Sequence, residues 1–259
     1  MQESLLTSHV KQMPDRINND FAVSLSDVTF SYSQDILYEE FSLTIEQSGS
    51  VAVLGASGSG KSTLGKMLAG IVEPRVGLRQ VHGSFTHRAD VVYIDQSPIN
   101  GILPWQRVRR NLEYPLQRLG WPWSRVAVRV DELLSRFRIA HLADAYPARL
   151  SGGELQRVSL ARNLSWSPKL AILDETFSSL DIKVRAEVID AVKKLSAEEG
   201  MSVVLITHNL ADAFALSTRC IVLGGRPIQV LRDLQTHDLS RREDNLESLL
   251  ADAIHQGFL

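Results

Sequence analysis

The chain has 259 residues, of which 44% are hydrophobic and 22% charged, the composition of an ordinary globular protein. Its 28 basic and 30 acidic residues leave a formal charge of −2, so no overall basic field indicates a nucleic-acid-binding protein. The single cysteine, Cys220, excludes an intramolecular disulfide and fits a reducing cytosol. The first twenty residues are polar and lack the apolar core of a signal peptide, and no apolar run is long enough to cross a bilayer.

Two kinds of strand pattern follow the polar residues 1–20, which we expect to form a flexible extension. Residues 23–30 and 41–45 alternate apolar and polar side chains, as antiparallel strands with one solvated face do. Other segments are continuously apolar, as strands buried on both faces of a parallel sheet are: 50–54, 91–94, 170–173 and 203–206. The pattern predicts an α/β protein with a mostly parallel sheet and an N-terminal antiparallel β piece.

The stretch from about 100 to 167 contains no comparable strand, and we expect it to be a helical subdomain inserted into the α/β core. Helical spacing of apolar residues predicts a helix at 126–138, and a second helix is expected at 154–166. Beyond Gly225 the strand signal weakens, and residues 245–256 have the pattern of a short terminal helix. We therefore divide the chain into three parts: an extension over 1–20, an α/β domain over 21–228, and a C-terminal extension over 229–259.

A glycine-rich turn at residues 55–62 joins an apolar run to a helix-like segment. The match to G-x-x-x-x-G-K-[ST] between a strand and a helix predicts a phosphate-binding loop for a nucleoside triphosphate, rather than a hairpin turn with a chance lysine. Its glycines let successive N–H groups face one anion, and the helix adds its positive dipole end. Lys61 is expected to reach the β- and γ-phosphates, and the Ser62 hydroxyl to hold Mg²⁺. The predicted nucleotide-binding residues are Gly55, Ala56, Ser57, Gly58, Ser59, Gly60, Lys61, Ser62 and Thr63.

Two carboxylates, Asp174 and Glu175, end the apolar run 170–173. An Asp-Glu pair is more often a feature of a helix N-terminus. A position at the carboxyl end of a parallel strand, with a phosphate-binding loop upstream, favours a catalytic role instead, because ligands of such sheets bind at that edge. Asp174 then faces Mg²⁺ in the manner of a Walker-B aspartate, and Glu175 polarises the attacking water.

A second anion-binding pattern occurs at Ser151, Gly152, Gly153 and Glu154, where a serine-glycine loop opens a helix. One nucleotide seldom needs two such loops from one chain. We therefore predict that these residues contact, in trans, a nucleotide that is held by another copy.

Together the two loops resemble those of the ATP-binding subunits of ABC transporters, whose signature is an LSGGQ-type loop. The resemblance covers about residues 22–225, with the motifs in the family's order. It implies that Tyr32 stacks on adenine and that Gln96 contacts Mg²⁺ and senses the membrane partner. It also implies that His208 holds the γ-phosphate. The D-loop residues, which touch the opposing subunit in the family, are Ser179, Leu180 and Asp181.

Three departures from the family pattern remove no group that hydrolysis requires. Glu154 replaces the glutamine of the signature, Thr176 stands where proline is usual, and Asn209 stands where aspartate is common. We therefore expect an active ATPase in which Glu175 and His208 are the catalytic residues.

The segment 102–111, with Leu103-Pro104-Trp105, resembles importers of nitrate, taurine and aliphatic sulfonates. Alternatively, Trp105 only packs the helical subdomain while Arg107, Arg109 and Arg110 form a solvated basic face. Residues 175–185 resemble the peptide and nickel importers instead, so that branch stays open as an alternative.

The resemblance implies an ATP-hydrolysing importer subunit that uses ATP and Mg²⁺. The expected partners are a second, identical ATPase subunit, transmembrane permease subunits and an extracytoplasmic solute-binding protein, with no nucleic acid. The expected location is the cytoplasmic face of the inner membrane, peripheral to it. A non-transport ABC ATPase and an ordinary phosphate-loop kinase are the competing classes. The first usually has a coiled-coil insertion or tandem cassettes, which 259 residues do not show, and the second needs no signature loop.

Overall fold

A computed structural model describes residues 21–236, so the expected extension over 1–20 and the expected helix at 245–256 lie outside the described residues. The strands are β1 (Phe21–Tyr32), β2 (Asp35–Glu46), β3 (Ser50–Leu54), β4 (Val76–Val81), β5 (Val91–Ile94), β6 (Leu170–Asp174), β7 (Ser202–Ile206), β8 (Arg219–Gly224) and β9 (Gln229–Gln235). The helices are α1 (Lys61–Ala69), α2 (Val108–Arg118), α3 (Trp123–Arg136), α4 (Gly152–Asn163), α5 (Ile182–Glu199) and α6 (Leu210–Leu216). Short 3₁₀ turns are η1 (Arg88–Asp90), η2 (Ala140–Leu142) and η3 (Pro147–Arg149).

The main sheet has six strands in the order β5-β6-β7-β3-β8-β9. All pairs from β5 to β8 are parallel, and β9 alone runs antiparallel to its neighbour. Every residue of β6 and β7 is buried, which is why these segments read as continuous apolar runs. The predicted α/β core with a mostly parallel sheet is confirmed.

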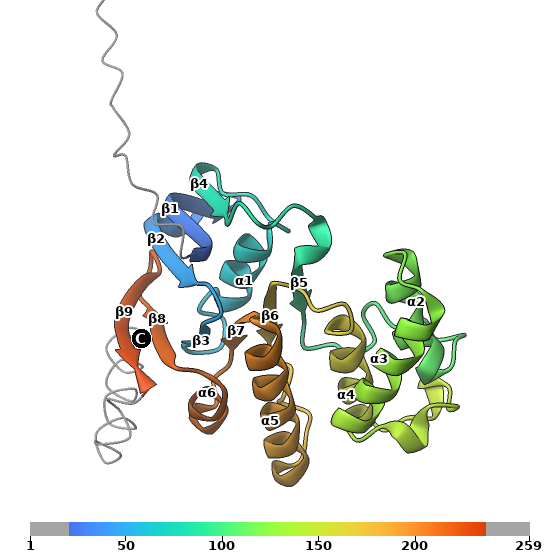
Figure 1. The fold of residues 1–259 in the computed structure, drawn as a ribbon. Coiled ribbons are helices and arrows are strands. Elements are labelled where there is room, and N and C mark those ends of the chain that lie inside the picture. Colours follow the sequence, from blue (N-terminus) through green and yellow to red (C-terminus); the bar gives the residue numbers. More distant parts are fainter. Residues whose placement is uncertain (1–20, 237–259) are drawn as a thin grey trace, which may run out of the picture.

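A second, antiparallel sheet has the strand order β2-β1-β4, as the alternating segments near the N-terminus predicted. Figure 1 shows α1 between this sheet and the main sheet. One hydrophobic cluster joins the three layers, with Val23 and Phe41 from the small sheet, Leu64 and Met67 from α1, and Ile172 from the main sheet. Helix α1 therefore joins the small sheet to the main sheet.

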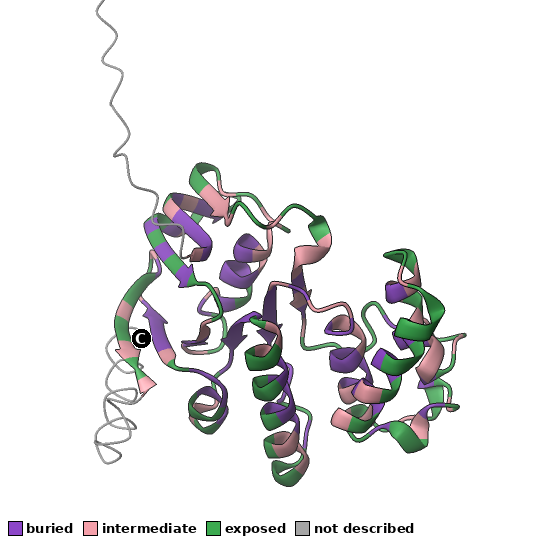
Figure 2. Cartoon of the chain, in the orientation of Figure 1, coloured by how far each residue is buried: buried purple, intermediate pink, exposed green. Residues whose placement is uncertain are grey.

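Helices α2, α3 and α4 form a lobe at one side of the main sheet, as Figure 1 shows. The predicted helix at 126–138 begins three residues earlier, at Trp123, and ends at Arg136. Apolar residues from the lobe, such as Leu112 and Leu133, share a single cluster with Leu173 of β6 and Val188 of α5. Figure 2 shows the buried positions of the lobe on the sides where its helices meet. The lobe and the sheet therefore share one continuous core.

Strand β9 was not expected from the sequence, and it extends the main sheet beyond the boundary drawn at residue 228. None of its residues is fully buried, so its side chains carry little hydrophobic signal. It is held instead by backbone pairing with β8 and by Arg219, which donates hydrogen bonds of 2.8 and 2.6 Å to the two carboxylate oxygens of Asp233. In the part of the chain that the structure describes, no helix has both the length and the hydropathy of a membrane span.

We expect Asp233→Asn to lower the free energy of unfolding by no more than about 1 kcal/mol at neutral pH, because the pair is partly exposed. The hydrogen bond from Arg219 lowers the pKa of Asp233. A lowered carboxylate pKa stabilises the fold above the ordinary aspartate value and loses that effect as the pH falls. Urea denaturation should therefore show a difference between parent and variant that is present at pH 7 and shrinks as the pH falls below about 4, the ordinary aspartate pKa. Equal stabilities at pH 7 would contradict this.

Candidate functional site

Most of the predicted nucleotide- and magnesium-binding residues lie at one edge of the main sheet because the strands that they follow are parallel. Strand β3 pairs in parallel with β7, β7 with β6, and β6 with β5, so all four carboxyl ends meet at the same edge. The loop 55–62 follows β3, Gln96 follows β5, Asp174 ends β6, and His208 follows β7. The topology thus assembles groups that lie up to 153 residues apart in sequence, since 208 − 55 = 153.

The loop 55–62 depends on glycine at two kinds of position. Gly58 and Gly60 have φ angles of +78° and +74°, in the region that glycine adopts without a steric cost. Gly55 is constrained by space instead, because a Cβ there would lie 2.8 Å from Ser59 Oγ and 2.9 Å from Leu223 O. The hydroxyl of Tyr38, a buried residue of β2, donates a 3.0 Å hydrogen bond to Gly60 O and so holds the end of the loop.

Lys61 folds back over this loop and is only 7% exposed. Its Nζ donates hydrogen bonds to Gly55 O at 2.9 Å and to Ala56 O at 2.6 Å. Burial lowers the pKa of Lys61, while the charges of Glu175 and Asp174 act in the opposite direction. The ammonium group therefore lies within the electrostatic reach of both predicted carboxylates.

Asp174 is 5% exposed and has one free acceptor. Its Oδ2 accepts a 2.5 Å hydrogen bond from the Tyr93 hydroxyl, whereas its buried Oδ1 has no hydrogen-bond partner among the described residues. A buried carboxylate oxygen without a partner is costly unless a ligand such as a cation satisfies it. Ser62 at the start of α1 and Gln96 after β5 are both exposed and offer the oxygen ligands that Mg²⁺ prefers. The residues present therefore fit a magnesium ion.

Sequence reasoning missed Tyr93, which orients Asp174 from the neighbouring strand. Burial, followed by the hydrogen bond to Asp174, raises the pKa of Tyr93 above that of an ordinary tyrosine. The available signal was a lone hydroxyl within the apolar run 91–94, on a strand expected to end at the site. Nothing in the sequence shows that β5 lies next to β6.

The two predicted catalytic residues contact each other directly. Nδ1 of His208 donates a 2.9 Å hydrogen bond to Oε1 of Glu175. Glu175 has a φ angle of +52°, an uncommon conformation for a residue with a side chain, and its N–H donates to Ile206 O at 2.9 Å. The His208 side chain is 68% exposed whereas that of Glu175 is 19% exposed, so the histidine is the partner with room to move.

The signature residues begin α4 and lie against the D-loop. Ser151 caps the helix, and one oxygen of Glu154, Oε2, accepts 2.8 Å hydrogen bonds from both the N–H and the hydroxyl of Ser151. The bond from the Ser151 N–H is the main cause of a lowered Glu154 pKa. A Cβ on Gly153 would lie 3.4 Å from Leu180 of the D-loop, and Asp181 caps α5 by accepting from the Val184 N–H at 3.1 Å.

The structure gathers the predicted residues into two groups. One contains the loop 55–63, Asp174, Glu175 and His208, together with Tyr32, whose half-exposed ring lies nearby with its hydroxyl 3.3 Å from Thr63 Oγ1. The other contains residues 151–154 and 179–181. Among the described residues, no hydrogen bond or ion pair joins one group to the other.

Comparison with known proteins identifies the family. The sequence profile described as "ABC transporter" matches residues 38–178, more than half of the chain. The chain belongs to the ABC transporter family. It is 36% identical over 214 residues to an aliphatic sulfonates import ATP-binding protein of Xanthomonas axonopodis pv. citri, covering 78% of this chain and 84% of that relative. It is 33% identical to a spermidine/putrescine import ATP-binding protein of Chromobacterium violaceum, covering 81% of this chain and 59% of that relative.

Solved structures agree with this fold. An ATP-binding subunit of an ABC transporter superposes with a TM-score of 0.76 at 24% identity, covering 89% of this chain and 99% of that one. The cbiO1 protein of Clostridium perfringens, part of the cbiONQ transporter complex, gives the same TM-score at 23% identity, covering 89% and 94%. The predicted family and fold are therefore confirmed, and the chain is an ATPase of the ABC transporter family.

The structure explains one of the departures from the family pattern and describes the surroundings of the segment 102–111. Asn209 caps α6 by accepting from the Asp212 N–H at 3.1 Å. Trp105 is 68% exposed, so packing within the lobe does not account for it. The side chains of Arg107, Arg109 and Arg110 are partly exposed, and each has an acidic partner: Asp144, Asp131 and Glu113 respectively. Thr176 is buried, and nothing in the structure explains its replacement of proline.

Lys61→Met should weaken ATP binding by about a hundredfold, because the only cation in the loop is lost while the apolar stem is kept. Isothermal titration calorimetry measures this directly. Lys66→Met on the same helix is the matched control, and it should bind ATP as the parent does. Equal affinities for parent and Lys61→Met would refute the assignment of the phosphate-binding lysine.

Proposed function

We propose that the chain is the ATP-hydrolysing subunit of an ABC importer and works as a homodimer. The observation that carries this is the division of the predicted site residues into two groups that no hydrogen bond or ion pair joins among the described residues. In an antiparallel pair of copies related by a two-fold axis, each loop 55–62 can face residues 151–154 of the partner, so that two ATP molecules lie at the interface. The names of the sulfonate and polyamine relatives both describe import, which supports that direction of transport.

The chemistry that we assign to each residue follows from its position. The loop N–H groups and Lys61 bind the phosphates, and the ring of Tyr32 stacks on the base. Glu175 accepts a proton from the attacking water, while His208 leaves Glu175 and donates to the γ-phosphate. Asp174, Ser62 and Gln96 hold Mg²⁺, which neutralises charge on the phosphates when bound. Ser151 and the first N–H groups of α4 stabilise the same γ-phosphate from the partner.

In this scheme the Glu175–His208 hydrogen bond controls when Glu175 can accept a proton from water. While Glu175 Oε1 accepts the hydrogen bond from His208, the lone pair that it uses is not available to the attacking water. The exposed histidine can exchange this contact for a phosphate oxygen, which would release Glu175 for proton transfer only when a triphosphate is present. On this proposal, nucleotide recognition and activation of the base are one event.

We propose that the chain docks on transmembrane permease subunits at the cytoplasmic face of the inner membrane, through the surface from Gln96 to Arg110. The exposed indole of Trp105 supports this, since large aromatic side chains are enriched in the centres of interfaces. An extracytoplasmic solute-binding protein completes the importer. No basic field supports a nucleic-acid partner.

A small anion such as a sulfonate, taurine or nitrate is the transported solute that we propose. The Leu103-Pro104-Trp105 segment and the sulfonate importers among the relatives support this. Relatives named for polyamine or methionine import, and the likeness of residues 175–185 to peptide and nickel importers, make other metabolites the alternative. In vesicles with the cognate permease and binding protein, taurine or an alkanesulfonate should stimulate ATP hydrolysis and spermidine should not. Stimulation by spermidine alone would contradict the anion assignment.

A mixture of two inactive variants tests the shared site. Lys61→Met and Ser151→Arg should each hydrolyse little ATP alone, because the first damages one half of every site and the second damages the other. A mixed dimer has one intact site, composed of Lys61 from one copy and Ser151 from the other. Random assortment makes half of the dimers mixed, so we expect about a quarter of the parent rate if the sites act independently.

Two outcomes of this ATPase assay would contradict the proposal. Full activity of Ser151→Arg alone would mean that the signature loop plays no part in hydrolysis, as in an ordinary phosphate-loop kinase. A mixture as inactive as its components would mean that the site is not shared. Lys66→Met mixed with Ser151→Arg, which leaves the loop lysines intact, controls for non-specific effects of mixing.

A further inference from the structure

Arg138 occupies a backbone position that ordinarily favours glycine. It follows the C-cap of α3, Phe137, with a φ angle of +54°. The Arg138 N–H donates to Ser135 O at 3.0 Å and the Ile139 N–H to Leu134 O at 2.8 Å, which closes the helix in a left-handed turn. A side chain at such a position is strained relative to glycine, so the arginine side chain must contribute elsewhere.

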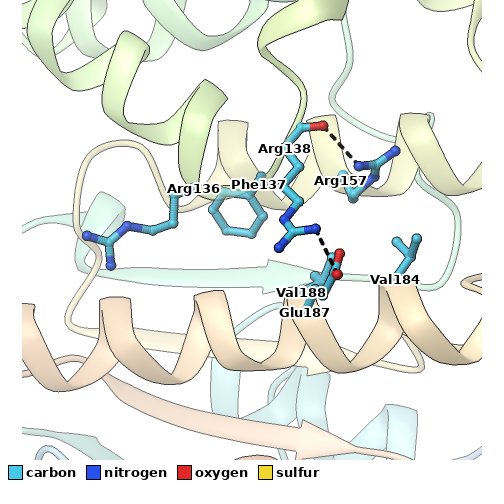
Figure 3. A pocket seen from close by; sticks show the side chains of 7 residues that line it. All are labelled: Arg136, Phe137, Arg138, Arg157, Val184, Glu187 and Val188. Carbon is cyan, nitrogen blue, oxygen red and sulfur yellow. Dashed lines mark hydrogen bonds and ion pairs between the residues drawn. The ribbon is translucent and has the colours of Figure 1, made fainter.

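That side chain joins α5, while the backbone of the same residue joins α4. The Arg138 carbonyl accepts a 3.0 Å hydrogen bond from Nη1 of Arg157, and Nη1 of Arg138 lies 2.7 Å from Oε1 of Glu187 (Figure 3). Arg157 belongs to α4 and Glu187 to α5. One residue therefore connects the end of α3 to two other helices.

Both of these helices begin at loops that the proposed dimer presents to its partner. Helix α4 is capped by Ser151 of the signature loop, and α5 is capped by Asp181 of the D-loop. Arg157 and Glu187 each lie six residues beyond their cap (157 − 151 and 187 − 181), which is about 9 Å along a helix. Arg157 and Glu187, the two residues that Arg138 contacts, therefore lie equally far along their helices from the two loops.

A small pocket lies between the three helices at this junction. Figure 3 shows the side chains that line it: Arg136, Phe137, Arg138, Arg157, Val184, Glu187 and Val188. Two other ion pairs, Arg129–Glu199 and Arg136–Glu198, tie α3 to the far end of α5. Arg129 also donates to the carbonyls of Leu164 and Ser165 at the C-terminal end of α4, so it joins α3 to α4 and α5 at the far ends of those two helices, whereas Arg138 joins them nearer the two loops.

We propose that Arg138 is a positioning residue that sets the signature loop at a fixed spacing from the D-loop, so that both meet the partner copy together. The inference rests on the proposed homodimer, in which ATP lies between the two copies. Arg138 is not among the predicted nucleotide-binding or catalytic residues. It acts on closure of the dimer, and hence on the rate of hydrolysis, and leaves ATP binding by the loop 55–62 unchanged.

Arg138→Gly is the sharpest test because glycine suits the observed φ angle. Its melting temperature should equal or exceed that of the parent, so a folding defect does not confuse the result. Its kcat should fall about two- to fivefold, the size expected for a link that is partly exposed. Its affinity for ATP, measured by calorimetry in the Glu175→Gln background, should stay at the parent value.

Companion variants separate positioning from a general surface effect. Glu187→Gln should lower kcat as much as Arg138→Gly, and the double variant should show no further loss. Arg138→Lys keeps the charge and the backbone strain, so it should restore most of the rate. Asp190→Asn, which breaks the Asp190–Lys194 pair within α5 alone, is the matched control and should have the parent kcat.

Parent kcat in Arg138→Gly would overturn the proposal. A similar loss in Asp190→Asn would also overturn it, because the effect would then belong to the charge of α5. Failure of the proposed homodimer can be distinguished from failure of the Arg138 proposal. It would appear as an inactive mixture of Lys61→Met and Ser151→Arg with Arg138 intact.

Discussion

The parallel pairing of β5, β6, β7 and β3 is the constraint on which the site depends. It places four carboxyl ends at one edge and therefore brings the loop 55–62, Gln96, Asp174 and His208 together. Buried residues on both faces fix this register, because a shift of one residue would turn every side chain to the opposite face. The hydrogen bonds from the Tyr93 hydroxyl to Asp174 and from the Glu175 N–H to Ile206 O both cross from one of these strands to its neighbour.

The other group of predicted site residues, 151–154 and 179–181, lies at the starts of α4 and α5. Gly153 lies against Leu180, so the signature loop and the D-loop form one surface of the same chain. Glu154 engages both donors of Ser151 through one carboxylate oxygen, which keeps the cap rigid. Behind these loops, Arg138 links α4 to α5 at the pocket of Figure 3. In the proposed homodimer, the edge of the sheet binds the nucleotide, and the surface formed by the signature loop and the D-loop completes the site of the partner copy.

Features that depend on local chemistry were predictable from the sequence. The glycine spacing of 55–62, the capping pattern of 151–154 and the four apolar runs each identify their element, and the resemblance to ABC subunits supplied Tyr32, Gln96 and His208. Features that depend on pairing between distant segments were not predictable. Strand β9 buries no side chain completely, Tyr93 meets Asp174 only because two strands are neighbours, and Glu175 meets His208 across 33 residues of sequence. The strain at Arg138 is likewise visible only in the backbone geometry.

Completion of each site by a second copy is the central claim, and the mass of the ATP-bound chain tests it most directly. Glu175→Gln should bind ATP without consuming it, because the amide cannot accept the proton of the attacking water. Sedimentation equilibrium of this variant should give the mass of a monomer, 28.8 kDa per chain, in ADP and that of a dimer in saturating ATP with Mg²⁺. A monomer in saturating ATP, at protein concentrations where calorimetry shows the nucleotide bound, would contradict the account.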